Sequence, residues 1–435
     1  MDVMVLSGVL MIAVLIVLLF LGTPIVVCIG FSSLAGILPT LDMVPSLITS
    51  AQRIFSGVSV FTLLAIPFFI LAGNIMNKGG IAVKLINLAR LITGPMPGAL
   101  AQTNVLANML FGAVSGSGIA AASAMGSIIG PIEKEEGYDV NFSAAVNIAS
   151  APTGLLIPPS NVLITYSLIS GGTSVAALFL AGYIPGILWG IACMIVVYFV
   201  AKKRGYIGQP RPPFKEAVKI VLESIPPLSL IIICVGGIVA GIFTATEASC
   251  IAVVYALLLS ILYRNITFKE VIDILRDSAE TTGIIMFLIG TSNIMGWVMS
   301  FTGLPDMIAK GLMSIGGGKI SILLIINVFL LFVGTFMDIT PAVLIFTPIF
   351  LPICKSFGMD PIHFGIMITF NLCIGGITPP VGNILYLGAR VGQTRVEKVM
   401  PHLLRYYVAI LIVLLMTTYI PAISMVLPEM AGMVK

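Results

Sequence analysis

Residues 361–388 read PIHFGIMITFNLCIGGITPPVGNILYLG, an apolar stretch that is interrupted near its centre by GG and PP. Residues 142–168, FSAAVNIASAPTGLLIPPSNVLITYSL, have the same form. Proline removes a backbone donor and clashes with the preceding turn, and glycine loosens the chain, so each stretch predicts a helix broken near its middle. Inside hydrocarbon, such a break persists only where it lines a cavity or binds an ion.

The composition indicates that this chain lies in lipid. Of its 435 residues, 58% are hydrophobic and only 9% are charged, which is too few to cover a water-exposed surface. The formal net charge is +4 and the basic residues are scattered, without a polybasic block that would bind nucleic acid. We therefore predict an all-α polytopic membrane protein in contact with the lipid bilayer and exclude a nucleic-acid partner.

Apolar segments long enough to cross a bilayer, about 20 residues as a helix, recur along the chain. The first has no basic residue ahead of it and no small-residue cleavage site, so it predicts a membrane helix in preference to a signal peptide. Uninterrupted spans are predicted at 3–21, 23–39, 58–77, 174–200, 225–243, 247–263, 280–302 and 403–427. The stretches interrupted by Gly, Pro or Ser are 97–131, 142–168, 320–353 and 361–388.

Clusters of basic residues predict the orientation of these segments. They lie in 78–90, 202–219, 264–276 and 390–405. The positive-inside rule places all four clusters in the cytoplasm. The segments connect the clusters only if 97–131 and 320–353 enter the membrane and return to the same side. We therefore predict two re-entrant helical hairpins, the first open to the cytoplasm and the second to the outside, with both chain ends outside.

An internal repeat supports this inverted arrangement independently of charge. LAGNIM at 71–76 matches TSNIM at 291–295, with Asn293 lying 219 residues after Asn74. Inverted repeats with interrupted helices are typical of secondary transporters, whose binding sites lie near the midplane at the breaks. At an offset of 221, Pro131, Gly137, Asp139, Gly154, Pro158 and Pro159 match Pro352, Gly358, Asp360, Gly375, Pro379 and Pro380.

Four interrupted segments carry the predicted chemistry: GAVSGSG (112–118), PTGLLIPPSN (152–161), GTFMDITP (334–341) and GGITPPVGN (375–383). Each PP break leaves upstream carbonyls without donors, and glycine lets these oxygens converge into a neutral cage suited to Na⁺. C-terminal ends of half-helices add partial negative charge there, whereas N-terminal ends favour an anionic substrate group. Side-chain groups that would complete such sites belong to Ser115, Ser117, Ser160, Asn161, Thr340, Thr378 and Asn383.

Other residues have competing interpretations. Small residues at 120–126 favour helix packing over binding. Asp338, in the second hairpin, could balance a cation, carry a proton or cap the helix that begins near Thr340. The acidic run 133–136 is predicted to be a solvated loop. The six cysteines stand singly in apolar stretches and are predicted to be small buried hydrophobes without a metal.

Taken together, these motifs resemble the large membrane subunit of tripartite ATP-independent periplasmic (TRAP) transporters over essentially the whole chain. The resemblance implies a Na⁺-coupled elevator carrier, in which a transport domain holding both hairpins slides against a scaffold. It also implies a soluble periplasmic substrate-binding protein and a small four-helix membrane subunit as partners. It rests on IPFFILAGNIMNKGG (66–80), VSGSGIAAASAMGSIIGPI (114–132), GY (137–138), GLLIPPSN (154–161), FMDITPAVLIFTPIFLP (336–352), GMDPIHFGI (358–366) and NLCIGGITPPVGNILY (371–386).

The resemblance further implies two sodium sites, and at least two Na⁺ are predicted to accompany one anion. The first site falls on Gly112, Ser115, Gly154, Ile157 and Pro158, mostly through backbone carbonyls. The second falls on Gly334, Gly375, Thr378 and Val381. Predicted substrate-binding residues are Ser117, Ser160, Asn161, Asp338, Thr340 and Asn383. The family's first tip often reads SGSS or SGSA, whereas Gly118 stands in the last place here, which bears on substrate choice.

The predicted function is import of a small organic acid anion, such as a C4-dicarboxylate or a sugar acid, across the bacterial inner membrane. The alternative is a stand-alone Na⁺- or H⁺-coupled di- or tricarboxylate carrier with the same hairpins. An enzyme is disfavoured because the sequence has no catalytic carboxylate pair or metal motif, and a GxxxxGK[ST] loop for an ATP-driven pump is missing. The predicted domains are scaffold helices (1–60), a first transport repeat (61–173), further scaffold helices (174–279), a second, inverted transport repeat (280–400) and a C-terminal helix (401–435).

Overall fold

The computed structural model describes residues 3–210, 212–305, 307, 310–311 and 318–434. All regular structure in this part of the chain is helical, which confirms the predicted all-α class. Among the described helices, eight are long and apolar enough to cross a bilayer, or up to nine if the bent pair Val140–Leu156 and Asn161–Ile169 forms one span. The chain is therefore a multi-pass membrane protein.

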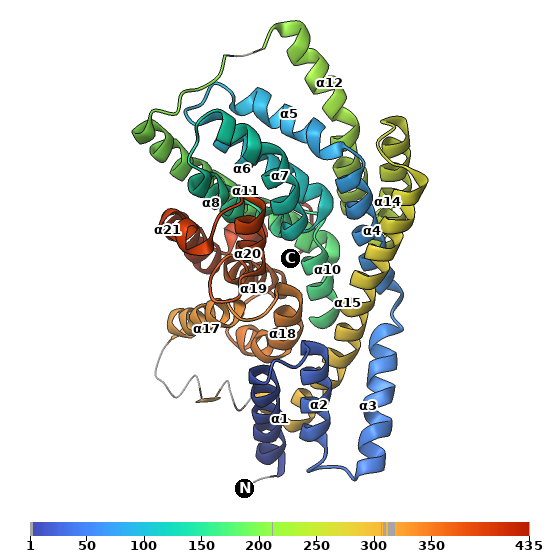
Figure 1. The fold of residues 1–435 in the computed structure, drawn as a ribbon. Helices are drawn as coiled ribbons and strands as arrows, with labels where there is room; N and C mark the ends of the chain where they lie inside the picture. Colours follow the sequence, from blue (N-terminus) through green and yellow to red (C-terminus); the bar gives the residue numbers. More distant parts are fainter. Residues whose placement is uncertain (1–2, 211, 306, 308–309, 312–317, 435) are drawn as a thin grey trace.

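One group of helices runs along one side of the molecule and is organised by its longest helix (Figure 1). Helix α15 packs against α1, α2, α3 and α4, and α14 lies along α4. A capping box between Thr267 and Glu270 begins α15, and Gly303, with a positive φ, ends it. This α15 group consists of α1 (Val3–Phe20), α2 (Ile25–Ile37), α3 (Met43–Val58), a 3₁₀ turn (Phe61–Leu64), α4 (Ala65–Lys78), α14 (Ala245–Leu262) and α15 (Phe268–Thr302).

The second group, the hairpin body, contains the segments that the sequence marks as interrupted. Its helices are α6 (Ala99–Ser115), α7 (Gly118–Glu135), α8 (Val140–Ser150), α9 (Thr153–Leu156), α10 (Asn161–Ile169), α11 (Val175–Arg204), α17 (Lys319–Gly334), α18 (Ile339–Ser356), α19 (Pro361–Gly375), α20 (Asn383–Val391), α21 (Val396–Tyr419) and α22 (Ala422–Met430). Helix α11 packs on α6, α9, α19 and α21, so it belongs to this body by its contacts.

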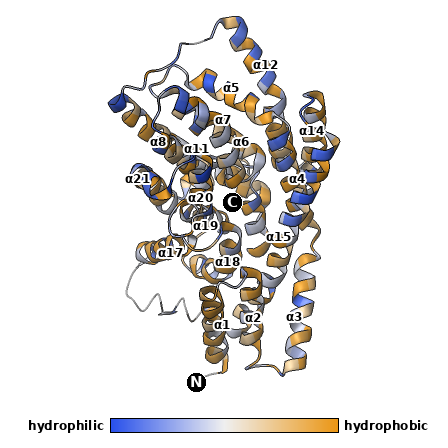
Figure 2. Ribbon diagram, viewed as in Figure 1, coloured by the Kyte–Doolittle hydropathy of each residue, from blue (hydrophilic) through white to orange (hydrophobic). Residues whose placement is uncertain are grey.

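The remaining helices connect the two groups at one end of the molecule. Helix α5 (Ile81–Thr93) packs on α6 and on α12 (Phe214–Ile231). Helix α12 continues through a π-helical turn (Ile232–Gly236) into α13 (Gly237–Val239). Figure 2 shows hydrophilic residues gathered at this end, on the outer turns of α12 and of α11, whereas α1 and α2 are mainly hydrophobic.

Both predicted broken helices are interrupted at their PP pairs. The first runs through α8 and α9, stops at Ile157 and resumes as α10 with a bend of 46°. The second stops at Gly375 and resumes as α20. Each begins with an aspartate at the N-cap: Asp139 Oδ1 accepts from the Asn141 amide (2.9 Å), and Asp360 Oδ1 from the Ile362 amide (2.7 Å). The repeated Asp of the sequence therefore has the same local role in both halves.

The prediction of buried, unpaired cysteines holds for five of the six. Cys28, Cys193, Cys234, Cys354 and Cys373 are buried, and Cys250 is partly exposed. Among the described residues, no cluster of His, Cys, Asp or Glu is arranged to hold a metal ion.

Candidate functional site

Two glycine pairs bring the hairpin helices into backbone contact with the broken helices. A Cβ added at Gly112 of α6 would overlap the Cα of Gly154 in α9, and a Cβ added at Gly375 of α19 would overlap the backbone of Gly334 in α17. Only glycine allows this approach. We call these contacts the first and second glycine crossings.

The residues predicted for the first sodium site surround the first crossing. Ser115 ends α6, and Gly116 follows in a left-handed conformation (φ 63°), close to the carbonyl of Pro159. On the other side of the crossing, α9 ends and the chain continues through Ile157 and Pro158. The first tip thus lies against the first break.

At the second crossing, a helix end again lies against a break, and hydrogen bonds join the two. The Val381 amide donates to the Thr335 carbonyl at 3.0 Å, which links the second break to the end of α17. The Thr378 hydroxyl donates to the Ile374 carbonyl at 2.7 Å. The four residues predicted for the second sodium site therefore lie around one short backbone contact.

Helix ends give the crossings their electrostatic character. Helices α6 and α9 end at the first crossing, and α17 and α19 end at the second. The last carbonyls of a helix have no intrahelical donor, and the macrodipole makes this end equivalent to about half a negative charge. Two such ends facing each other, with neutral carbonyl and hydroxyl oxygens, suit a hard monovalent cation.

A cavity of about 460 Å³ lies beside both crossings. The first residues of α7, α10, α18 and α20 line it, so four helix N-termini, each with a partial positive charge, point toward one space. Helices α4 and α15 form the opposite wall. Of the residues predicted to bind substrate, those on the cavity wall are Ser117, Asn161, Asp338, Thr340 and Asn383.

Ser160, the sixth predicted substrate residue, does not line this cavity. Its side chain is fully buried, donates to the Leu155 carbonyl (2.5 Å) and accepts from the Leu163 amide (3.4 Å). The hydroxyl is therefore occupied in closing the first break and capping α10. Ser117 caps α7 similarly by accepting from the Ala120 amide (3.2 Å), but it keeps its place on the cavity wall.

Asp338 occupies the N-cap position of α18 without a capping hydrogen bond from its side chain. Its Oδ1 instead accepts from the Asn383 side-chain amide at 3.3 Å, which joins the starts of α18 and α20 on the cavity wall. Of the three roles considered for Asp338 from the sequence, helix capping is not supported, because no backbone amide of α18 donates to its side chain. The carboxylate is left on the wall of the cavity.

Some wall residues carried little or no signal in the sequence. Asn74 and Asn77 line the cavity from α4, and Asn74 donates to Ser278 of α15 at 2.8 Å. The repeated NIM motif marked Asn74, but nothing marked Thr281 of α15. A Cβ at Gly118 would lie 2.9 Å from the terminal methyl group of Ile384 and 3.2 Å from a terminal methyl group of Leu155, so a larger residue there would shift only flexible side-chain ends.

The prediction that the acidic run 133–136 is a solvated loop is wrong for Glu133. This residue lies in the last turn of α7, and its side chain is fully buried. Glu135 and Glu136 are exposed, as predicted. The sequence could not separate them, because burial of Glu133 depends on α6 and α8 packing over one face of α7.

The chain matches a model of the family described as "Tripartite ATP-independent periplasmic transporter, DctM component" over residues 12–423. It is 51% identical to an uncharacterized protein, YgiK, of Salmonella typhimurium over 414 residues, 95% of each chain. It is 36% identical to the sialic acid TRAP transporter large permease protein SiaM of Vibrio cholerae, covering 95% of this chain and 96% of that protein.

Among solved structures, the fold is similar to that of the YdaH transporter of Alcanivorax borkumensis. The TM-score is 0.61 at 14% sequence identity, with 87% of this chain and 88% of the other covered. This likeness concerns the fold alone. The family match and the relatives extend over almost the whole chain, so it belongs to the DctM component, the large permease, of the tripartite ATP-independent periplasmic transporters.

Proposed function

We propose that this chain carries a small organic acid anion across the membrane together with Na⁺. The observation that supports this most directly is the separation of helix ends by sign: four N-terminal ends line one cavity, and C-terminal ends meet in pairs at the two glycine crossings. The first arrangement attracts an anion and the second a cation. Because the two are adjacent, binding of Na⁺ strengthens the field that holds the anion.

The proposed substrate class follows from the size and lining of the cavity. About 460 Å³ is within the usual range of small-molecule sites. Neither Lys nor Arg is among the described residues that line it. A carboxylate would thus be held by helix N-termini, hydroxyls and amides. The sialic acid relative supports a sugar acid, and a C4-dicarboxylate is the other candidate from the sequence.

Two crossings suggest at least two Na⁺ for each anion. With a singly charged anion, two Na⁺ leave one net inward positive charge, which would add about 2.3 kcal/mol for every 100 mV of membrane potential, whereas a doubly charged C4-dicarboxylate would need a third Na⁺ for the same gain. Neutral ligands at both crossings favour Na⁺ over a proton as the driving ion, since a proton requires a titratable group.

We further propose that the hairpin body moves against the α15 group as an elevator. The contact between them at the first tip involves Gly73 of α4, where a Cβ would lie only 2.8 Å from the Ser115 carbonyl. A smooth helix surface at this point favours sliding. By its contacts, α11 moves with the hairpin body, so we place the domain boundary after α11 and not at residue 174.

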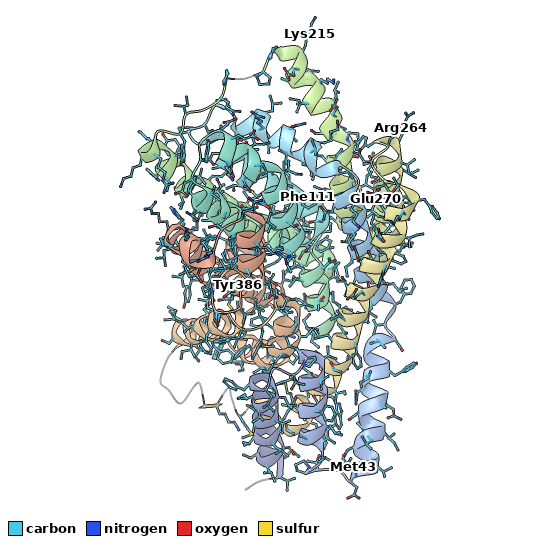
Figure 3. All side chains as sticks on the ribbon, viewed as in Figure 1. Met43, Phe111, Lys215, Arg264, Glu270 and Tyr386 are labelled. Atoms are coloured by element: carbon cyan, nitrogen blue, oxygen red, sulfur yellow. The ribbon has the colours of Figure 1, made fainter. Side chains whose placement is uncertain are left out.

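The proposed topology has the two halves of the hairpin body inverted, with α6–α7 and α17–α18 as re-entrant hairpins. Figure 3 shows Lys215 and Arg264 at one end of the molecule and Met43 at the opposite end. The first two belong to basic clusters, so their end faces the cytoplasm of the inner membrane. The N-terminus lies at the outer end (Figure 1).

The tripartite family implies two partners, and the surface of the chain is compatible with one of them. Large apolar side chains are exposed on α3, α12, the adjoining π-turn, α14 and α15, including Phe55, Leu222, Ile232, Leu262 and Ile284. We propose that the small four-helix subunit covers part of this surface and that a periplasmic binding protein delivers the anion to the outer end.

The test is uptake of sugar acids and C4-dicarboxylates into proteoliposomes that contain the complete transporter and its binding protein. A Na⁺ gradient should drive uptake. Thr378→Val should weaken the dependence on Na⁺ by removing a hydroxyl at the second crossing, Thr378→Ser should preserve it, and Asp338→Asn should leave it largely intact. Uptake driven by a pH gradient without Na⁺, and abolished by Asp338→Asn, would refute the sodium mechanism. Robust uptake by the single purified chain would indicate a stand-alone carrier.

A further inference from the structure

Glu133 is a buried carboxyl group that takes part in neither the sodium binding nor the substrate binding proposed above. Among the described residues, neither of its oxygens makes a well-aligned hydrogen bond, although donor groups of Asn104 and Ser143 lie close by, and no ion pair involves it. Two neighbouring polar atoms, Asn104 Nδ2 and Ser143 Oγ, are also buried and unpartnered. An ionised carboxylate in such a place costs several kcal/mol, so the group needs a proton or a cation.

A route to water lies beside this group. A crevice of about 1060 Å³ between α7, α8 and α20 is lined by Glu133, Asn104 and Ser143. The exposed residues Lys134, Glu135, Arg395 and Lys398 also line it, at the end of the molecule assigned to the cytoplasm. The carboxyl group is thus inaccessible to bulk water but adjacent to a cytoplasmic crevice.

The surroundings favour a proton over Na⁺ at Glu133. The Asn104 amide oxygen accepts from Asn108 Nδ2 at 2.9 Å, so its NH₂ group, a donor, is the part left for the carboxyl group. A cation site would need the oxygen. Three of the four exposed charged residues that line the crevice are basic, which opposes entry of a cation, whereas Na⁺ at the crossings would meet only neutral oxygens and helix C-termini.

The second half of the chain provides an internal comparison. Position 354, which is 133 + 221, holds Cys354, and this thiol is buried among apolar residues. In the same half, Asn371 Nδ2 donates to Asn327 Oδ1 at 2.7 Å, as Asn108 does to its neighbours in the first half. Packing of a hairpin against its broken helix therefore does not require a carboxyl group.

Buried hydrogen bonds extend from Asn104, which lines the crevice with Glu133, toward the first crossing. Asn108 Nδ2 lies within hydrogen-bond distance of Asn147 Oδ1 (3.0 Å) and Ser150 Oγ (2.9 Å) in α8, as well as of Asn104. Asn104, Asn108 and Gly112 are spaced by four residues and share one face of α6. From the helical rise, Asn104 and Gly112 are about 12 Å apart.

We propose that Glu133 is a proton-binding site reached from the cytoplasm. Proton binding at Glu133 and Na⁺ binding at the first crossing weaken each other. This rests on the sodium function proposed above. Burial raises the pKa of Glu133 to about 8, with Ser143 and Asn104 partly offsetting the rise. The helical rise places the ionised carboxylate between about 12 Å (Asn104 to Gly112) and about 22 Å (Glu133 to Gly118) from the first tip and crossing, so at an effective dielectric constant of about 20 its charge strengthens cation binding roughly three- to tenfold. Uptake of a cytoplasmic proton would thus promote release of Na⁺ into the cytoplasm.

Among the described titratable groups nearby, only His402 of α21, 3.7 Å from Asp139, is of a type that ionises between pH 5 and 9, and because it is present in every variant its contribution cancels in the comparison with Glu133→Gln. Tyr138, in the loop after α7, and Tyr406 of α21 interact electrostatically with Glu133. Phenols titrate near pH 10, and burial raises the pKa of Tyr138 to about 12. The crevice also exposes Lys134 and Glu135 from α7 and Arg395 and Lys398 from the segment after α20, all outside the buried pocket.

The experiment measures thermal unfolding of the purified full chain in detergent, between pH 5 and 9, with and without Na⁺. Glu133→Gln removes the titrating group, Glu133→Asp retains one, and Glu135→Gln is the matched control on the exposed face of α7. Without Na⁺, the stability of the wild type should fall relative to Glu133→Gln as pH rises toward about 8 and level off above it, because only the wild type must ionise a buried group.

With Na⁺, the half-saturating concentration that stabilises the wild type should decrease several-fold from pH 6 to 9. In Glu133→Gln it should stay at the higher value, and Glu133→Asp should restore the dependence on pH. If the thermal stabilities of the wild type and Glu133→Gln change in parallel at every pH, the proposed proton site is wrong. Loss of one bound Na⁺ from Glu133→Gln at all pH values would instead identify the carboxylate as a Na⁺ ligand. Absence of any Na⁺ effect in all variants would refute the sodium function and the proposed opposition of ions, while the Na⁺-free comparison would still decide whether Glu133 binds a proton.

Discussion

Gly112 and Gly154 approach each other so closely that a single methyl group on either would displace a backbone. In the second half the same holds for Gly375, whose Cβ would lie 2.3 Å from the Gly334 backbone, whereas a Cβ at Gly334 would make a tight contact of 3.0 Å with Gly375. The local sequence identifies these glycines as helix breakers, but their mutual contact explains why no other residue fits. At this scale, the proposed Na⁺ sites depend on the absence of side chains as much as on the presence of oxygens.

Gly112→Ala should therefore lower stability by about 1–3 kcal/mol, the usual cost of overpacking, and weaken Na⁺ binding, because α6 and α9 must separate. The measurement is thermal unfolding in detergent with and without Na⁺. Gly130→Ala is the control: nothing lies within 4 Å of a Cβ at that position in α7. Alanine there should be neutral or stabilising by up to about 1 kcal/mol. Equal behaviour of the two variants would argue against the crossing as a determinant of the site.

At the scale of single elements, the broken helices are defined by their ends. Ser160 closes the first break and caps α10, whereas Gly382 (φ 27°) precedes α20 without a side-chain cap. The two breaks thus resemble each other in sequence but differ in how their second half-helix begins. The aspartates at the starts of α8 and α19 are, by contrast, equivalent caps.

Asp360→Ala should destabilise the protein by about 1 kcal/mol because the Ile362 amide loses its acceptor, whereas Asp360→Asn should be nearly neutral since asparagine caps equally well. Thermal unfolding of the two variants tests this. At Asp139 the same pair of changes should differ less cleanly, because Asp139 also pairs with Arg204 at 2.8 Å. If Asp360→Asn were as damaging as Asp360→Ala, the charge and not the cap would be what matters.

At the scale of the whole molecule, the cavity lies between two bodies, and successive segments of the chain belong first to one body and then to the other. Helices α4 and α15 supply one wall, and α7, α10, α18 and α20 supply the other. An elevator movement would slide these walls past each other and carry the helix N-termini with their anion. In the proposed elevator movement, the long helix α15 would stay fixed while the hairpin body slides along it.

A covalent link across the cavity should stop transport. Ile119 of α7 and Ile285 of α15 both line it, so cysteines at these positions, joined by a bifunctional thiol reagent in a background without the partly exposed Cys250, should reduce uptake to background. Each single cysteine variant, treated identically, should retain uptake. Full cross-linking with undiminished uptake would rule out relative movement of these walls during the cycle.

The sequence by itself determined the helical class, the places where helices break and the residues around both crossings, because a missing donor at proline and a free φ at glycine are properties of a few consecutive residues. Of the six substrate residues predicted from the sequence, five line the cavity. Tertiary structure alone decided that Glu133 is buried while Glu135 and Glu136 are exposed, that Ser160 turns away from the cavity, and that α11 packs with the hairpin body. These outcomes depend on which helices, distant in sequence, cover a given face, and burial of a charge or direction of a hydroxyl is fixed only when that packing is complete.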